Sequence, residues 1–245
     1  MESYPYIVKT IQDVFASCSN CYWLLTKQQL SKKNPSTVLD ISGHGINGTL
    51  SHFNFSSFPN LTTLDMSHNK LSDIIPVEIG NLTDLEYLSL EVNYLDGNIP
   101  YQISHLQQLQ HLNLGSNYLV GPNWSMFLDL PYLTSLDLGH NNLASEFSSF
   151  VVTLRNLTFL GMASRRLPRN ISRLSKLKKL YLGENKFSGS IPDEIGLLQH
   201  LQVLELYDNL YEGSIPSSIG QLRELQTLDL SGDHLNSTIP PELGL

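Results

Sequence analysis

This 245-residue sequence has few basic residues, only two cysteines and no long apolar run. Its 15 Lys and Arg stand against 23 Asp and Glu, which gives a formal net charge of −8. Nucleic acids and anionic membranes are bound through clustered Lys and Arg, so we predict neither as the main partner. No stretch approaches the roughly 20 apolar residues that a membrane-spanning helix needs. We therefore predict no membrane contact by this chain itself.

The sequence also lacks the motifs of catalysis. It holds no H-E-x-x-H zinc motif, no G-x-S-x-G nucleophile elbow and none of the kinase motifs V-A-I-K, H-R-D and D-F-G. Residues 43–48, Gly-His-Gly-Ile-Asn-Gly, do match the G-x-G-x-x-G fingerprint. A nucleotide site needs a helix that opens on the last glycine, whereas here the chain continues with Thr-Leu-Ser. We predict no enzymatic activity and no cofactor.

The two cysteines, Cys18 and Cys21, have C-x-x-C spacing. A structural zinc site needs four ligands, and the sequence has no second cysteine pair, so we predict no metal site. Two interpretations stay open. The cysteines form a disulfide, with each other or with cysteines upstream, or they are two free thiols.

What the sequence does have is an internal repeat, best seen in residues 82–105, LTDLEYLSLEVNYLDGNIPYQISH. Leu and Ile recur at fixed positions, with Asn93, Gly97 and the pair Ile99-Pro100 at fixed offsets. A period in the twenties with this Leu and Asn pattern is typical of a leucine-rich repeat, in which each unit supplies one short strand to a solenoid. We place nine repeats over residues 35–245. The sixth, residues 154–173, is shortened because its Asn-x-Leu-x-Gly segment is missing.

These repeats predict an α/β solenoid, a right-handed superhelix with a parallel sheet on its concave face. In each Leu-x-Leu pair, two side chains point inward and the residue between them points outward. An Asn three residues after the pair can bond turn backbone that would otherwise be buried unpaired. His44, Arg165 and Asp233 replace this Asn, so we expect a looser array at both ends and at the sixth repeat. Residues 1–34 lie outside the repeats and are predicted to be a cap-like segment with a short helix.

The outward positions of the strands predict a ligand-binding face. Exposed aromatic residues interleaved with charge are typical of interface anchors. The alternative is that any solenoid must present some side chains on this face. The predicted ligand-binding residues are Tyr87, Glu91, His111, His140, Phe159, Lys179, Tyr181, Glu184, Glu205, Tyr207 and Asp208.

Asn-x-Ser/Thr sequons are abundant, which favours a surface made in the secretory pathway. In the register of the repeat, none falls on the concave strands, so glycans would leave the inner face open. The N-terminal segment has no basic leader and no uninterrupted apolar core, so it does not look like a signal peptide. The predicted glycosylation sites are Asn47, Asn54, Asn60, Asn81, Asn123, Asn156, Asn170 and Asn236.

The fuller pattern LxxLxxLxLxxNxLxGxIPxxIGx resembles the plant-type leucine-rich repeat of receptor-like kinases and receptor-like proteins. Ile-Pro pairs at 75–76, 99–100, 191–192, 215–216 and 239–240 carry the resemblance over about residues 36–245. It implies an extracellular, cell-surface solenoid that binds a peptide, a protein ligand or a co-receptor ectodomain. Intact members add a signal peptide, a cysteine-containing cap, a membrane helix and often a kinase.

The chain departs from this family in its cap and at its end. The run Cys18-Ser-Asn-Cys21-Tyr-Trp23 is similar to the cap of such ectodomains, and this implies a cap disulfide. The usual Trp-x-Gly-x-x-Cys run and a C-terminal cysteine cap are absent.

We therefore interpret the sequence as a fragment of a plant leucine-rich-repeat receptor that acts in signalling or defence. One alternative is a secreted inhibitor of microbial cell-wall-degrading enzymes, similar to polygalacturonase inhibitors. Another is a nonfunctional receptor remnant. The flanking transcript would separate the three.

Overall fold

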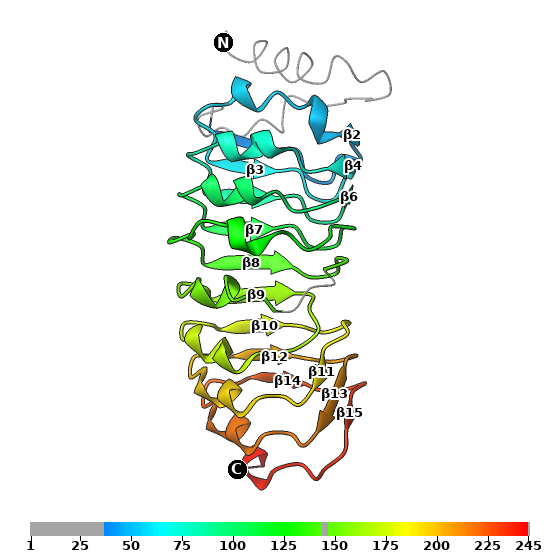
Figure 1. Cartoon of the computed structure of the whole chain (residues 1–245), viewed down its shortest axis with the longest axis vertical. Helices are drawn as coiled ribbons and strands as arrows, with labels where there is room; N and C mark the ends of the chain where they lie inside the picture. Colours follow the sequence, from blue (N-terminus) through cyan, green and yellow to red (C-terminus); the bar gives the residue numbers. More distant parts are fainter. Residues whose placement is uncertain (1–36, 144–146, 245) are drawn as a thin grey trace. The chain divides into compact units, whose positions relative to one another are not determined.

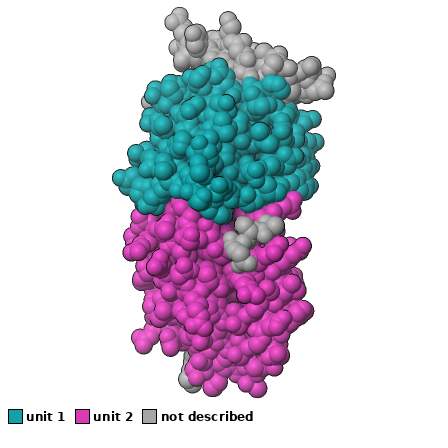
Figure 2. All heavy atoms as spheres, in the orientation of Figure 1, with its two compact units in different colours: residues 1–132 teal, residues 133–245 magenta. Residues whose placement is uncertain are grey.

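The computed structural model describes residues 37–143 and 147–244. The predicted cap over residues 1–34, with its short helix and with Cys18 and Cys21, lies outside them. The chain forms two compact units, Met1–Tyr132 and Leu133–Leu245 (Figure 2). The predicted boundary between cap and repeats stays a prediction.

Each unit is built on parallel strands that begin at the outward residue before a Leu and that stack in chain order (Figure 1). Corresponding leucines lie side by side, as in the pairing of Leu64 with Leu88 and of Leu180 with Leu204. The strands of unit 1 are β1 (Val38–Asp40), β3 (Thr63–Asp65), β5 (Tyr87–Ser89) and β7 (His111–Asn113). Those of unit 2 are β8 (Ser135–Leu138), β9 (Phe159–Met162), β10 (Lys179–Tyr181), β12 (Val203–Glu205) and β14 (Thr227–Asp229). These nine strands confirm the predicted repeat solenoid with a parallel sheet.

A second, smaller sheet in each unit was not predicted. It forms from the x-Leu-x-Gly residues that follow the ladder Asn, and these strands also run parallel. In unit 1 the strands are β2 (Asn47–Thr49), β4 (Lys70–Ile74) and β6 (Tyr94–Asp96). In unit 2 they are β11 (Ser188–Gly189), β13 (Leu210–Gly213) and β15 (His234–Leu235).

Every helix in the described residues is a short 3-10 turn, so the helical layer predicted as α is in fact 3-10. Half of the ten turns follow the proline of an Ile-Pro pair, and they close i→i+3 hydrogen bonds such as Ile79 N–H to Pro76 O at 3.2 Å. Three to five residues are too few to nucleate an α-helix. Unit 1 contains η1 (Leu50–His52), η2 (Phe55–Ser57), η3 (Val77–Asn81), η4 (Tyr101–His105) and η5 (Trp124–Met126). Unit 2 contains η6 (Val151–Thr153), η7 (Arg169–Arg173), η8 (Asp193–Leu197), η9 (Ser217–Gln221) and η10 (Pro241–Leu243).

The core of each unit is a stack of Leu and Ile side chains from successive repeats. Leu88 and Leu90 in unit 1, and Leu180 and Leu182 in unit 2, are fully buried. Replacing one such leucine by Ala typically costs about 2–5 kcal/mol of stability. The regular spacing of the inward residues therefore holds the outward residues of the same strands in a fixed row.

The predicted asparagine ladder is confirmed by its hydrogen bonds. Asn93 Oδ1 accepts Leu71 N–H at 2.9 Å, and its Nδ2 donates to Met66 O and Leu90 O, both at 3.0 Å. Asn117 donates to the equivalent carbonyls of its own and the preceding repeat. Each of these amides is buried, so the ladder satisfies backbone groups that water cannot reach.

The short sixth repeat breaks the second sheet of unit 2. The chain passes from β9 directly to Pro168 and η7, and Leu167 takes the buried place that Ile191 has in the next repeat. No described residue of this repeat pairs with β11 as a strand, which leaves β11 at the edge of its sheet. Ser188 N–H instead donates to Arg165 O at 2.7 Å.

Candidate recognition face

The structure divides the predicted ligand-binding residues between the two units. Tyr87, Glu91 and His111 lie in unit 1, and the other eight lie in unit 2. All eleven are exposed or half-buried. The side chains that point outward from β8, β9, β10, β12 and β14, with the turns that follow these strands, are called the sheet face of unit 2 below.

An aromatic pair occupies the middle of this sheet face. The Phe159 and Tyr181 rings have centroids 5.2 Å apart and planes tilted by 37°. Tyr181 stands opposite Gly161 in the β9–β10 register, so no side chain separates it from the Phe159 ring. Both rings are half-buried and thus present apolar surface to solvent.

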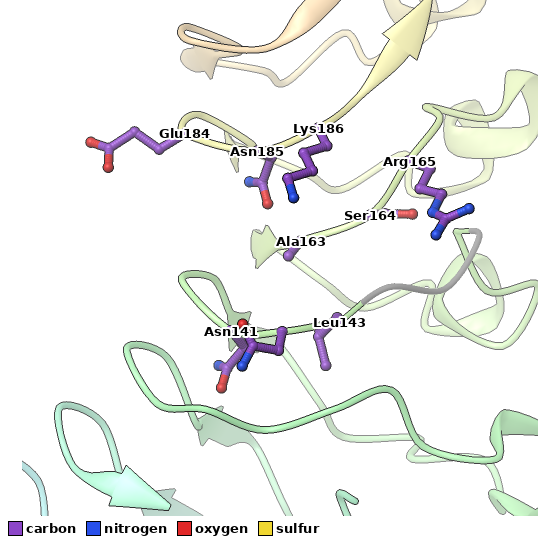
Figure 3. Close-up of a pocket in the computed structure, with 9 residues that line it drawn as sticks. Asn141, Leu143, Ala163, Ser164, Arg165, Glu184, Asn185 and Lys186 are labelled. Atoms are coloured by element: carbon purple, nitrogen blue, oxygen red, sulfur yellow. The ribbon is translucent and has the colours of Figure 1, made fainter. Parts of the chain in front are cut away.

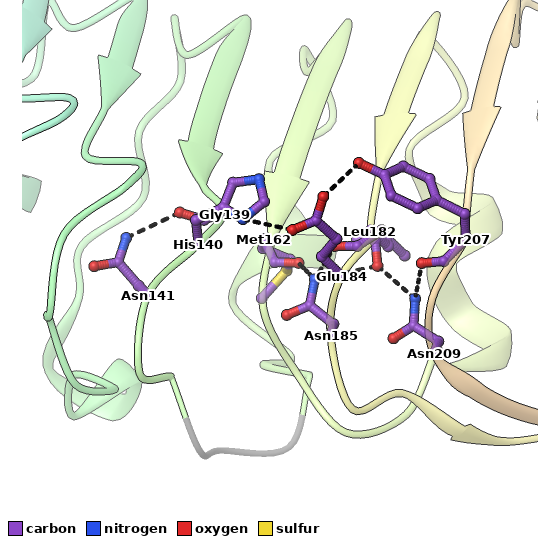
Figure 4. Close-up of polar contacts among 10 residues, drawn as sticks. Gly139, His140, Asn141, Met162, Leu182, Glu184, Asn185, Tyr207 and Asn209 are labelled. Carbon is purple, nitrogen blue, oxygen red and sulfur yellow. Dashed lines mark hydrogen bonds and ion pairs between the residues drawn. The ribbon is translucent and has the colours of Figure 1, made fainter. Parts of the chain in front are cut away.

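A third aromatic residue, Tyr207, follows β12 and is held by a carboxylate. Its hydroxyl donates to Glu184 Oε1 at 3.2 Å, and Glu184 Oε2 lies 4.0 Å from His140 Nδ1 (Figure 4). A Cβ atom at Gly183 would overlap the Tyr207 ring. Gly183 is not among the predicted residues, because only side chains were considered as candidates. Its place between the outward residues Tyr181 and Glu184 could have drawn attention to it.

The turns after the strands fix the direction of three predicted residues. His140, Glu184 and Asp208 have φ angles of 49°, 54° and 51°, the left-handed region. Each immediately precedes the ladder position of its repeat, where the chain leaves the sheet. Asn, Asp and His occur in this region more often than other non-glycine residues, whereas Glu adopts it at some cost. The three side chains are thereby set at the rim of the sheet face.

Acidic groups crowd this face and perturb the titration of its residues. Burial and the nearby Glu205 carboxylate raise the pKa of Tyr181. Burial and Asp229 raise the pKa of Glu205 itself. Burial and Glu184 likewise raise the pKa of Tyr207. Each of the three groups lies near a carboxylate, so a positive charge added to the sheet face of unit 2 would be favoured.

Asp137 and Asp229 extend the acidic surface beyond the predicted set. Burial raises the pKa of Asp137, which accepts Gly139 N–H at 2.9 Å. Asp229 Oδ1 accepts both the N–H and the hydroxyl of Ser231, at 3.0 and 2.6 Å. Neither residue is in the predicted ligand-binding set, although an Asp two residues before Ser or Gly recurs in the sequence. Their carboxylates are fixed in place before any ligand arrives.

Unit 1 repeats the same chemistry on its own strands. The Tyr87 and His111 rings lie 5.9 Å apart. Asn113 Nδ2 donates to Glu91 Oε2 at 2.8 Å. Burial, followed by the Asp65 carboxylate, raises the pKa of Tyr87. This smaller group is aromatic and acidic, like the sheet face of unit 2.

The predicted glycosylation sites lie away from the main strands. Seven of the eight asparagines are exposed. The eighth, Asn156, is half-buried and accepts a hydrogen bond from Lys176 Nζ at 2.7 Å. Asn47 lies in β2 of the second sheet, and Asn123 caps η5. Glycosylation itself stays a prediction.

Unit 1 also has a groove beside the first residues of η3 and η4. It has a volume of about 650 Å³ and is lined largely by apolar residues, among them Ile74 and Val77, each 49% exposed. Asn123, a predicted glycosylation site, stands at its rim. A glycan at this position would cover part of the groove.

Neither metal nor membrane chemistry is indicated by the described residues. Residues 37–143 and 147–244 bring together no group of three or more His, Cys, Asp or Glu side chains that could hold a metal ion. Over the same residues, no helix has the length and apolarity that crossing a membrane requires.

Comparison with known proteins gives a family and several similar structures. The leucine rich repeat family model matches residues 37–95, 100–143 and 175–235. No curated protein was found to match the chain.

Among solved structures, the plant peptide hormone receptor RGFR1 in complex with RGF2 is 33% identical over 81% of this chain and 32% of that chain, with a TM-score of 0.74. The ectodomain of the Arabidopsis receptor kinase HAESA, solved with an N-terminally extended IDA peptide hormone, is 27% identical over 99% and 48%, with a TM-score of 0.80. A TDR receptor is 26% identical over 85% and 45%, with a TM-score of 0.65. The chain therefore spans less than half the length of each of these receptors.

Proposed function

The chain belongs to the leucine-rich repeat family, and from this premise we propose that it is an extracellular recognition module of a plant receptor. It binds a peptide or protein ligand, or a co-receptor ectodomain, through the sheet face of unit 2. It performs no catalysis itself. Its role is to convert the presence of that ligand into a bound complex at the cell surface.

The observation that carries this proposal is the cluster of Phe159, Tyr181 and Tyr207 among fixed carboxylates. Rigid aromatic side chains contribute large contact area at low entropic cost and are enriched among residues that dominate binding energy. Tyr207 is held by Glu184 before binding, which reduces the ordering that a ligand must impose.

The similar structures support a peptide as the ligand class. RGFR1 and HAESA were solved in complex with the peptide hormones RGF2 and IDA. A peptide laid across the strands of unit 2 would meet a new outward side chain about every 4.8 Å, the spacing of neighbouring strands. An extended peptide advances about 3.3 Å per residue, so about three of its residues span two strand spacings.

The charge of the face supports a basic ligand. Glu184, Glu205, Asp208 and Asp229 lie around the aromatic cluster, and Lys179 is the one lysine in the predicted ligand-binding set. Burial, and after it the Asp229 carboxylate, raises the pKa of Glu205, and the contribution of Asp229 supports a ligand of positive charge. Lys or Arg side chains flanking an apolar or aromatic residue would complement this arrangement.

Secretion and glycosylation fit the same proposal. The eight sequon asparagines lie off the main strands, so glycans at these positions leave the aromatic cluster open. The chain would reach the cell surface as part of a longer receptor, since it spans only 32% of RGFR1 and 48% of HAESA.

Panning a random peptide library on the whole chain, produced as a secreted glycoprotein, tests the proposal. We expect enrichment of peptides that combine Lys or Arg with apolar or aromatic residues. Alanine at both Tyr181 and Tyr207 should weaken binding of the selected peptide at least tenfold, as measured by isothermal titration.

A matched control removes two tyrosines elsewhere. Tyr94 and Tyr118 are exposed and stack on each other at 6.4 Å in unit 1, away from the sheet face of unit 2. Alanine at both should leave the affinity unchanged. Equal affinities for the two double variants would refute the sheet face as the binding surface.

A further inference from the structure

The short sixth repeat leaves a cavity in unit 2. Its volume is about 350 Å³, more than twice the roughly 150 Å³ left by deleting one core side chain, and it lies within the range of ligand pockets. Figure 3 shows the pocket between the segment after β8 and the segment after β10. The residues that line it are Asn141, Asn142, Leu143, Ala163, Ser164, Arg165, Glu184, Asn185 and Lys186.

In complete repeats this space is filled by one residue, two positions after the ladder Asn. Phe187 is an example: its side chain is fully buried, its N–H donates to Asn209 Oδ1 at 2.9 Å, and its C=O accepts Leu210 N–H at 2.8 Å. Leu95 is bonded in the same way, with its N–H on Asn117 Oδ1 at 3.0 Å and its C=O accepting Tyr118 N–H at 2.8 Å. One residue thus supplies a donor, an acceptor and an apolar side chain.

The sixth repeat has no such residue, and the groups that it would meet stay open. Asn185 Oδ1, which corresponds to Asn209 Oδ1, accepts no hydrogen bond from the described residues. Lys186 N–H, which corresponds to Leu210 N–H, has no acceptor within the same part of the chain. An acceptor and a donor therefore face the cavity at the spacing of a single extended residue.

Two cations stand at the same cavity. Neither Arg165 nor Lys186 forms an ion pair with a residue that the structure describes. Glu184 also lines the cavity, but its carboxylate is engaged by Tyr207 and lies next to His140. Among the described lining residues, two cations without an ion pair therefore stand against one engaged carboxylate, which favours a guest that carries negative charge.

We propose that this cavity binds an extended acidic segment of a partner protein, which takes the place of the missing part of the sixth repeat. One guest residue directs an apolar side chain between Leu143 and Phe187. Its N–H donates to Asn185 Oδ1 and its C=O accepts Lys186 N–H. A neighbouring Asp or Glu of the guest meets Arg165 and the Lys186 side chain. The recognition is a form of strand addition beside β11. The site adjoins the sheet face at Glu184 but uses none of its aromatic residues, Phe159, Tyr181 and Tyr207.

The chain itself supplies a probe. Residues 93–97, Asn-Tyr-Leu-Asp-Gly, form the equivalent segment of the third repeat and contain both the apolar and the acidic residue. We would titrate a fluorescein-labelled peptide of this sequence, with its C-terminus amidated, against the whole chain and measure polarisation. Saturable binding is expected. Replacing its Leu by Ser, or its Asp by Lys, should each weaken binding at least fivefold.

Variants of the protein locate the site. Arg165→Ala with Lys186→Ala should weaken binding at least fivefold, whereas Arg155→Ala with Arg223→Ala, two exposed cations elsewhere in unit 2, should not change it. Tyr181→Ala should also keep full affinity, because Tyr181 does not line the cavity. Loss of binding with Tyr181→Ala would place the peptide on the sheet face and overturn the proposal.

A repaired protein gives the decisive comparison. Replacing residues 165–166 by the six residues Asn-Tyr-Leu-Asp-Gly-Asn, copied from positions 93–98, restores the length of the sixth repeat. We expect this variant to melt at a higher temperature than the natural chain and to lose the peptide. A repaired variant that is folded by circular dichroism and still binds the peptide refutes the proposal, as does a natural chain that does not bind it.

Discussion

The asparagine ladder of unit 2 allows a matched pair of substitutions, Asn209→Ala and Asn185→Ala. Both residues occupy the same position of successive repeats and differ in what they hold. Asn209 is 3% exposed, whereas Asn185 borders the cavity and is half-buried. We predict that the first substitution destabilises the protein far more than the second, although the chemical change is identical.

The magnitude follows from the backbone groups that each amide satisfies. Asn209 accepts Phe187 N–H at 2.9 Å and donates to Leu206 O at 2.7 Å. Leu206 O has no second donor among the described residues, so Asn209→Ala leaves two buried backbone groups unpaired. Each such group costs about 1–3 kcal/mol, which gives a loss of roughly 3 kcal/mol.

Asn185→Ala removes fewer hydrogen bonds on which buried backbone groups depend. Its Nδ2 donates to Leu182 O at 3.1 Å, but that carbonyl also accepts from Asn209 Nδ2 at 2.8 Å and keeps this bond. Its longest bond, to Met162 O, is 3.4 Å. The adjacent cavity can also admit water, which would bond the backbone groups that Asn185→Ala leaves unpaired. We expect a loss of about 1 kcal/mol.

Equilibrium urea unfolding, followed by far-UV circular dichroism on the whole chain, measures both losses. The free energy of unfolding should differ between the variants by roughly 2 kcal/mol, the difference of the two estimates. Equal losses, or a larger loss for Asn185→Ala, would show that the hydrogen bonds of the ladder do not set its stability.

Three further substitutions test other local features. Asp233→Asn should stabilise the protein by about 1 kcal/mol at pH 7, because an amide can donate to Leu206 O as a carboxylate cannot. Burial raises the pKa of Asp233, so the ionised carboxylate destabilises the fold as pH rises through that pKa. The stability gained by Asp233→Asn should therefore shrink on acidification. Thermal melts over a pH series measure this gain, and a gain that does not change with pH would contradict the reasoning. Tyr211→Phe should raise stability by roughly 1 kcal/mol, since the Tyr211 hydroxyl is buried without a partner among the described residues; a loss in urea unfolding would argue that the hydroxyl is bonded. Val92→Asn should also raise stability by about 1 kcal/mol, because Val92 is a β-branched residue at φ 52°, and an unchanged melting temperature would mean that the turn relaxes.

The repeat, its inward residues and the asparagine ladder could all be predicted from the sequence. These features depend on local periodicity: strand alternation decides which side of Leu88 or Leu180 is buried, and an amide at Asn93 or Asn117 can satisfy turn backbone in any stack of such repeats. The outward positions followed from the same alternation, so the predicted ligand-binding residues are exposed or half-buried in the structure.

The contacts that these residues make between repeats could be seen only in the tertiary structure. The second sheet and the 3-10 turns depend on hydrogen bonds between repeats, which a local pattern of polar and Gly residues does not specify. The contact of Tyr207 with Glu184 needs the empty space at Gly183 one repeat away. The sequence showed that the sixth repeat was short, but only the stacking of its neighbours shows that Asn185 and Lys186 are left facing a cavity. The bond from Tyr207 to Glu184 joins residues 23 positions apart, and the geometry of such non-local contacts follows from packing rather than from periodicity.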